Sequence, residues 1–149
     1  MRTVASNSIT IDCPIEVVFS YLSDLSNYPK WFVGVDAMRR QNNVAGSGAK
    51  YLEVAKVPLF GKTDIDVTVI HQDFPRLLRF EAALEPLRPL FMLRLQPLTE
   101  TSVHLSWLCE TRNQNQGFRI FLLPLISRLL FARSAKSLDQ LKFLMENTR

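Results

Sequence analysis

GFRIFLLPLISRLLFARSAKSLDQLKFLMEN, residues 117–147, is the longest stretch of helical periodicity in this sequence, and the fold depends on what that helix covers. On a helical wheel, one side of the stretch is apolar or small along its whole length, and charged and amide side chains lie opposite in the second half. That side contains Ile120, Leu123, Ser127, Leu130, Ser134, Leu138, Leu141, Leu144 and Met145. We expect this side to pack against a β-sheet.

Most of the chain before this helix alternates between apolar and polar residues, which is typical of strands with one buried face. The clearest case is TDIDVTVIHQ, where Ile65, Val67 and Val69 alternate with polar residues. Strands are predicted at Ser8–Asp12, 33–43, 50–57, 63–72, 77–84, 89–97 and 102–112, and short helices at 12–25 and 24–31. Short turns make consecutive strands antiparallel neighbours. This order predicts an α+β fold, in which a curved sheet of about seven strands wraps around the C-terminal helix.

Size and composition argue against two broad classes of function. The 149 residues fit one domain, residues 1–149. The formal net charge of +4 is small and no nucleic-acid-binding motif accompanies it, so binding to nucleic acid is not predicted. The N-terminus lacks the apolar segment of a secretion signal, and Cys13 and Cys109 fit reduced, buried thiols. A cytoplasmic protein is therefore expected, with attachment to a membrane surface left open.

The first half of the C-terminal helix has a second apolar side, which the sheet cannot also cover. This side contains Phe118, Leu122, Leu125 and Leu129, flanked by Arg119 and Arg128. Five basic residues and no acidic residue lie between Thr111 and Leu138. The apolar run is too short and too often interrupted to span a membrane. Three covers fit the pattern: loops of the same chain, a second subunit in a homodimer, or a membrane surface whose anionic headgroups meet the arginines.

Five further segments carry a family resemblance. They are CPIEVVFSYLSDLSNYPKW (13–31), GSGAKYLEV (46–54), IHQDFPRLLRFE (70–81), TSVHLSW (101–107) and LDQLKFLMEN (138–147). In order and character they resemble the START-like helix-grip superfamily, also called SRPBCC, in its polyketide cyclase/dehydrase and lipid-transport branch. The resemblance covers nearly the whole chain. Its motifs mark the fold more strongly than any one activity, because this superfamily includes carriers, receptors and enzymes.

The resemblance implies a cavity between the sheet and the C-terminal helix, holding an apolar small molecule such as a lipid, a quinone or a polyketide-like compound. Binding or transport is the leading hypothesis, and an aromatase/cyclase-type enzyme and a protein-interaction module are the alternatives. The residues expected to line the cavity are Trp31, Tyr51, Glu53, Val67, Phe80, Leu93, Trp107, Leu123 and Leu130. Core packing is the alternative role for the two tryptophans. No cofactor is implied, and His71 and His104 have no partner at metal-ligand spacing.

Two charged residues could give the cavity a polar anchor, depending on which way their strands face. If Leu52 and Val54 point inward, Glu53 is a surface acid, and the apolar character of these neighbours favours this arrangement. If Tyr51 and Glu53 point inward, they form a polar anchor in an apolar pocket. Arg94 is expected to face solvent, because the apolar residues of its strand alternate with it. An inward Arg94 would bind a carboxylate or stabilise an enolate, as a cyclase requires.

Overall fold

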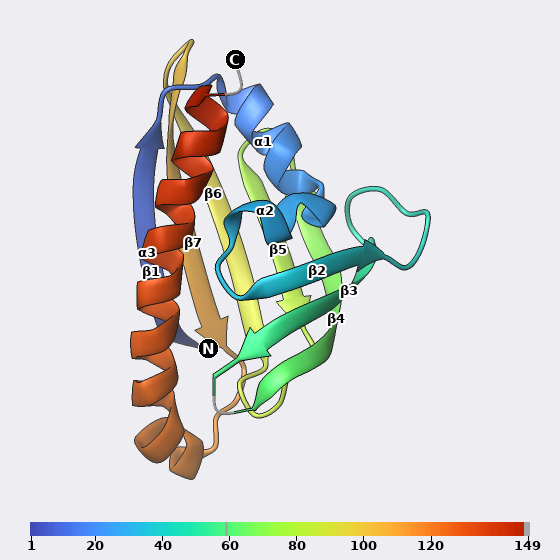
Figure 1. The fold of residues 1–149 in the computed structure, drawn as a ribbon, viewed down its shortest axis with the longest axis vertical. Coiled ribbons are helices and arrows are strands. Elements are labelled where there is room, and N and C mark those ends of the chain that lie inside the picture. The colour runs from blue at the N-terminus through green and yellow to red at the C-terminus, as the bar shows by residue number, and fades with distance from the viewer. Residues whose placement is uncertain (59, 148–149) are drawn as a thin grey trace.

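The fold was analysed in a computed structural model, which describes residues 1–58 and 60–147 (Figure 1). In chain order the strands and α-helices are β1 (Arg2–Ile11), α1 (Ile15–Ser23), α2 (Tyr28–Trp31), β2 (Val35–Arg40), β3 (Lys50–Val57), β4 (Gly61–Asp73), β5 (Leu77–Ala82), β6 (Pro89–Thr99), β7 (Ser102–Thr111) and α3 (Leu123–Asn147). A 3₁₀ turn at Leu25–Asn27 precedes α2, and a π-helical turn at Phe118–Leu122 precedes α3. Pro14 and Pro29 stand at the starts of helices, where the missing N–H is not needed, and Pro124 directly follows the π-helical turn.

The seven strands form one antiparallel sheet in the order β1-β7-β6-β5-β4-β3-β2. Strands β2 to β7 follow one another along the sheet. Strand β1 pairs with β7 at one edge, and α1 and α2 carry the chain across to β2 at the other. This confirms the predicted α+β helix-grip fold, with two short helices after the first strand and a long C-terminal helix.

The strand boundaries differ most from the prediction at β1, which begins at Arg2 instead of Ser8. The pairing explains the difference. Arg2 lies opposite Thr111 and Ile11 lies opposite Val103, so β1 follows almost the whole of β7. Hydrogen bonding to a neighbouring strand therefore extends β1 into residues whose own pattern does not indicate a strand.

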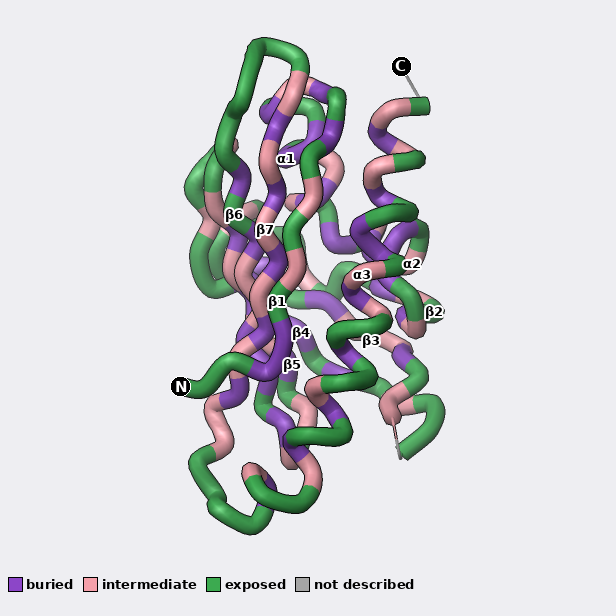
Figure 2. Tube along the Cα trace, turned by 90° about the vertical axis from the view of Figure 1, so that its left-hand side faces the viewer, coloured by how far each residue is buried: buried purple, intermediate pink, exposed green. Residues whose placement is uncertain are grey.

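The core lies between the concave face of the sheet and one side of α3, which runs along β1 at one edge of the sheet (Figures 1 and 2). In β4, the side chains of Ile65, Val67 and Val69 are buried, as their alternation predicts. The buried side of α3 contains Leu123, Ile126, Leu130, Ser134, Ser137, Leu138, Leu141 and Met145. The predicted inward side is thus correct at Leu123, Leu130, Ser134, Leu138, Leu141 and Met145, whereas Ser127 and Leu144 are half-buried and the burial of Ile126 and Ser137 was not predicted.

Two buried serines bring α3 close to the sheet and to the segment after α2. The side-chain amide of Asn7 in β1 donates to Ser134 Oγ at 2.7 Å. The backbone N–H of Val33 donates to Ser137 Oγ at 2.8 Å. Both serines are fully buried. Small side chains that also accept hydrogen bonds fix the rotation of α3 about its axis, and this rotation decides which residues face the space beneath its first half.

The π-helical turn at the start of the C-terminal helix corrects two predictions. The N–H of Leu123 donates to the carbonyl of Phe118, five residues back. Because this turn contains one residue more than an α-helical turn, it rotates the side chains before Leu123 relative to α3. Phe118 is therefore buried, and Ile120 is 63% exposed. Phe118 is wrong as a membrane or partner contact and Ile120 is wrong as a sheet-facing residue, because both assignments assumed a continuous α-helix.

Candidate functional site

A pocket lies between the first half of α3 and the half of the sheet that contains β2 to β5. The turn between β3 and β4 and the segment between β5 and β6 complete its wall. Its cavity volume is about 80 Å³, and the figure rises to about 760 Å³ only when all the space between the lining atoms and the open solvent is counted. Its apolar lining includes Phe32, Val35, Ala55, Ile65, Phe91, Ile126 and Leu130. Four charged residues also line it: Glu53, Lys56, Glu85 and Arg133.

Glu53 faces this pocket because of the register between β3 and β4. It lies opposite Ile65, and Tyr51 lies opposite Val67. Residues directly opposite each other in antiparallel strands share a face of the sheet. Since Ile65 and Val67 are buried on the concave face, Tyr51 and Glu53 share that face. The favoured expectation of a solvent-facing Glu53 is therefore wrong. The pairing with β4 overrides the more apolar character of the other face of β3.

The carboxyl group of Glu53 is surrounded by the apolar lining and takes part in none of the ion pairs between described residues. Burial raises its pKa to about 7. A buried carboxylate without a compensating cation or hydrogen bond takes up a proton more readily, because its charged form loses hydration. Near neutral pH the pocket thus contains an acid that can donate or accept a proton.

The hydroxyl of Tyr28 lines the pocket near this carboxyl group, and the indole N–H of Trp107 lies beside the hydroxyl, behind the lining. Tyr28 Oη and Trp107 Nε1 are buried, and neither has a hydrogen-bond partner within residues 1–58 and 60–147. They lie near each other, but the contact falls short of hydrogen-bond geometry. Burial raises the pKa of Tyr28 well above its usual value, the charge of Glu53 raises it further, and the indole of Trp107 lowers it. Buried donors normally have a partner, so the Tyr28 hydroxyl, which lines the pocket, is available to a bound molecule, whereas Trp107 does not line it.

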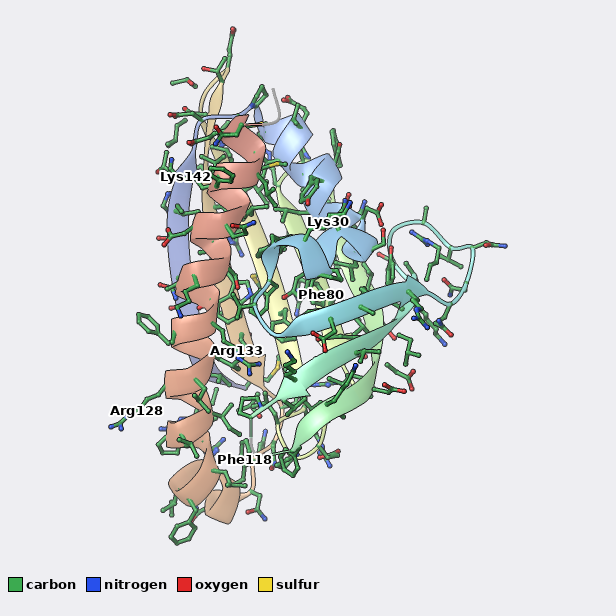
Figure 3. All side chains as sticks on the ribbon, viewed as in Figure 1. Lys30, Phe80, Phe118, Arg128, Arg133 and Lys142 are labelled. Atoms are coloured by element: carbon green, nitrogen blue, oxygen red, sulfur yellow. The ribbon has the colours of Figure 1, made fainter. Side chains whose placement is uncertain are left out.

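Packed aromatic rings hold this polar group in place. The ring of Tyr28 stacks on Phe32 at 5.0 Å between centroids and meets Phe80 edge-on at 5.7 Å. The ring of Trp107 lies 5.8 Å from Phe32 and 6.1 Å from Phe91. Rings in such contacts have little rotational freedom, so the phenol and the indole N–H keep fixed directions. Phe80, labelled in Figure 3, joins this cluster by meeting Tyr28 edge-on and stacking on Phe91 at 5.1 Å, and it does not line the pocket.

Of the nine residues predicted to line a cavity, Glu53 and Leu130 line this pocket. The other seven, Trp31, Tyr51, Val67, Phe80, Leu93, Trp107 and Leu123, are buried in the core around it and do not line it. Alternation identifies the inward face of a strand, but close packing against the helices fills most of that face. The hydroxyl of Tyr51, for example, accepts a hydrogen bond from Arg40 at 2.7 Å.

Among the lining residues that the sequence pattern did not predict are Tyr28, Phe32, Ile126 and Arg133. Two of them belong to the cluster YPKWF around α2, whose density of aromatic rings was a usable signal. The other two follow the helical repeat. Arg133 comes three residues after Leu130, and Ile126 comes four residues before it, so both positions share the pocket-facing side of α3.

The second apolar side of the C-terminal helix is exposed over much of its length. The exposed fractions are 79% for Phe121, 43% for Leu125 and 37% for Leu129. Arg128 is exposed and points away from the sheet, whereas Leu122 and Arg119 are half-buried (Figure 3). No helix within the described residues is long and apolar enough to cross a membrane.

Other candidate chemistry lies outside the pocket. Arg94 is exposed, as its alternation predicted. Burial, together with the charge of Glu110, raises the pKa of the Cys109 thiol well above its usual value, which disfavours the nucleophilic thiolate. Within the described ranges, no three His, Cys, Asp or Glu side chains are grouped to hold a metal ion.

The sequence from residue 2 to residue 146 matches the family model described as polyketide cyclase/dehydrase and lipid transport. The chain belongs to this family. No curated protein matches it. Solved structures share the fold at low sequence identity, among them a START superfamily protein from Mycobacterium smegmatis, with 14% identity, a TM-score of 0.71 and coverage of 97% of both chains.

Two further structures show how widely this fold is used. Protein TTHA0849 from Thermus thermophilus is 19% identical, with a TM-score of 0.70 and coverage of 93% of both chains. The di-domain ARO/CYC StfQ from the steffimycin biosynthetic pathway is 10% identical, with a TM-score of 0.71. This second match covers 96% of the present chain and 50% of StfQ. At these identities the likeness shows the fold alone.

The raised pKa of Glu53 predicts a pH dependence of stability. Between its ordinary pKa of 4.5 and a folded-state value of about 7, the folded protein binds a proton that the unfolded chain has lost. Glu53 should therefore lower the free energy of unfolding as pH rises through this window, by up to about 3 kcal/mol. The measurement is urea unfolding near pH 5 and near pH 8, comparing the native protein with Glu53→Gln.

The Glu53→Gln variant should lose this part of the pH dependence, because glutamine does not titrate. Glu100→Gln, in the exposed turn after β6, is the matched control and should keep the native dependence. An identical slope in the native protein and Glu53→Gln would show that the carboxyl group is not buried in an apolar pocket.

Proposed function

We propose that the protein binds an apolar small molecule, of the size of a lipid acyl chain, a quinone or a polyketide-like compound, in the pocket beneath the first half of α3. This proposal rests on an apolar cavity lined by the Tyr28 hydroxyl, which has no hydrogen-bond partner among the described residues. Ligand pockets typically combine a mostly apolar wall with a few fixed polar groups that orient the bound molecule. Each 100 Å² of apolar surface that the ligand buries would contribute about 2.5 kcal/mol.

The comparisons support the same class of function without selecting a ligand. The family description includes lipid transport, and StfQ is an ARO/CYC protein of a biosynthetic pathway. Both descriptions imply contact with apolar organic molecules. Carriage or sensing of such a molecule therefore fits the fold, the pocket and the family together.

Filling the pocket should abolish binding. Ala55 is a buried lining residue, so Ala55→Phe would place a ring in the space that the ligand needs. We expect it to weaken binding of the uncharged fluorescent probe N-phenyl-1-naphthylamine by about tenfold or more. Ile126→Phe, from the opposite wall, provides a second test if the first variant folds poorly.

The matched control is Ala132→Phe, which adds the same ring at an exposed position of α3, the helix that contains Ile126. Circular dichroism confirms that each variant is folded. Native mass spectrometry of the gently purified protein shows whether it retains an apolar molecule. Equal probe affinity in the folded pocket variants and the native protein would contradict the proposed site.

A second candidate function, an aromatase/cyclase-type enzyme, is favoured by Glu53 itself. A general acid or base works best when its pKa is near the operating pH, and the pKa of Glu53 is raised to about 7. The phenol of Tyr28 would supply the second convergent polar group that such an enzyme requires. Glu53→Gln separates the two functions, because it should preserve the affinity of a carrier but abolish turnover by an enzyme.

We also propose that the first half of the C-terminal helix docks on an anionic lipid surface beside the pocket. Its exposed apolar residues are Ile120, Phe121, Leu125, Leu129 and Phe131. Between Thr111 and Leu138 the chain has five basic residues and no acidic residue. An apolar helix side flanked by cations alone is complementary to anionic headgroups.

The pocket and this exposed surface share one helix. Ile126 and Leu130 line the pocket, while Leu125 and Leu129 lie next to them on the outer side. An apolar ligand could thus pass between membrane and pocket along a short path. Among the five basic residues, Arg112 already pairs with Glu81 at 2.8 Å. Arg128 and Lys136 are exposed, and their charges are available to lipid headgroups.

Acidic substitutions on this surface should reduce membrane binding. Phe121→Glu and Leu125→Glu should each lower co-sedimentation with phosphatidylglycerol vesicles by about tenfold. Phe143→Glu is the matched control, since Phe143 is 61% exposed in the second half of the same helix. Equal binding by all variants would contradict the proposal. A change from dimer to monomer in size-exclusion chromatography, without a change in vesicle binding, would instead assign the surface to a second subunit.

A further inference from the structure

Arg133 is one of two cations in the described pocket lining, the other being Lys56, and it reaches across from α3 toward the strands. Its Nη1 donates to the carbonyl of Lys56 at the end of β3, at 2.6 Å. Figure 3 shows the contrast with Arg128, which points away from the sheet. No ion pair between described residues involves Arg133. Because a guanidinium carries five N–H groups, most of its hydrogen-bonding capacity is unused.

Gly34 makes room for this guanidinium. A Cβ atom at position 34 would lie 2.6 Å from Nη1 of Arg133, closer than a non-bonded contact allows. The backbone of Gly34 also has a φ of 95°, which residues with a side chain rarely adopt. Gly34 lines the pocket as well. The positive φ by itself requires glycine at position 34, and the missing side chain leaves the place of the guanidinium unobstructed.

The charges in the lining are separated along the pocket. Glu53 is at the inner end, beside Tyr28, whereas Arg133 and Lys56 are near the surface. The remaining charged lining residue, Glu85, pairs with Arg88 at 2.6 Å. A ligand carboxylate at the inner end would meet a carboxyl group and an apolar wall, and both disfavour negative charge. At the mouth it would meet an arginine without a carboxylate partner.

We propose that the ligand is an apolar carboxylic acid, and that Arg133 binds its carboxylate at the mouth while the apolar part enters the pocket toward Tyr28 and Glu53. This inference rests on the proposed binding function and adds the class and the direction of the ligand. The planar guanidinium can donate two parallel hydrogen bonds to one carboxylate, which a lysine ammonium cannot do. An alcohol of the same chain length would gain the apolar contacts but not this pair.

The test compares decanoate with decanol, two probes with the same chain length that differ in charge. Affinities are measured near neutral pH by displacement of N-phenyl-1-naphthylamine. The native protein should bind decanoate at least as tightly as decanol. Arg133→Gln should weaken decanoate binding by about tenfold or more, as expected for lost hydrogen bonds to a charged group, and should leave decanol binding nearly unchanged. Arg128→Gln, on the same helix but outside the pocket, is the matched control for loss of one positive charge.

Arg133→Lys keeps the charge without the planar fork and should give an intermediate loss for decanoate alone. It also keeps the test valid if the glutamine variant folds poorly. Equal losses for both probes in Arg133→Gln would overturn the inference, because they would indicate a structural role. Binding of decanol but not decanoate by the native protein would also overturn it, while leaving the proposed function intact. Binding of neither probe would count against both.

Discussion

One helix cannot cover the concave face of seven strands. Six gaps of about 4.8 Å make such a sheet roughly 29 Å wide, whereas a helix with its side chains is about 10–12 Å across. The chain places α3 along β1, at one edge, and α1 and α2 cover part of the remainder (Figure 1). The hydrogen bond from Asn7 to Ser134 holds α3 at that edge, and the bond from Val33 to Ser137 joins α3 to the segment after α2. The uncovered area beside β3 and β4 becomes the pocket.

The chemistry of the pocket follows from where this uncovered area lies. Beneath it the register between β3 and β4 directs Glu53 inward, and the segment around α2 adds the phenol of Tyr28. Without a cation beside it, Glu53 has a pKa raised to about 7. Across the mouth, the link from Arg133 to Lys56 joins α3 to β3 at 2.6 Å. The apolar wall, the acid Glu53 at the inner end and the cation Arg133 at the mouth thus all follow from the position of α3 on the sheet.

The sequence predicts the architecture better than the site. Alternation in strands such as β4, and most of the helical repeat from Leu123 onward, depend on local periodicity and are correct. The direction of Glu53 depends on pairing with another strand, and the burial of Phe118 depends on a π-helical turn, so local pattern misassigned both. Whether an inward-facing residue lines the pocket or is covered by other side chains depends on how closely the helices approach the sheet. For that reason Trp107, although inward as expected, lies behind the pocket wall.

Measuring the pKa of Glu53 tests most directly whether its carboxyl group is buried in the apolar pocket. The carboxyl carbons of glutamate can be followed by ¹³C NMR as a function of pH, with Glu53→Gln identifying the signal. Burial in the apolar pocket predicts a titration midpoint near 7. Occupation of the pocket by N-phenyl-1-naphthylamine should raise it further, because the probe would displace water from the carboxyl group. A midpoint near the ordinary value of 4.5, unchanged by the probe, would contradict the account.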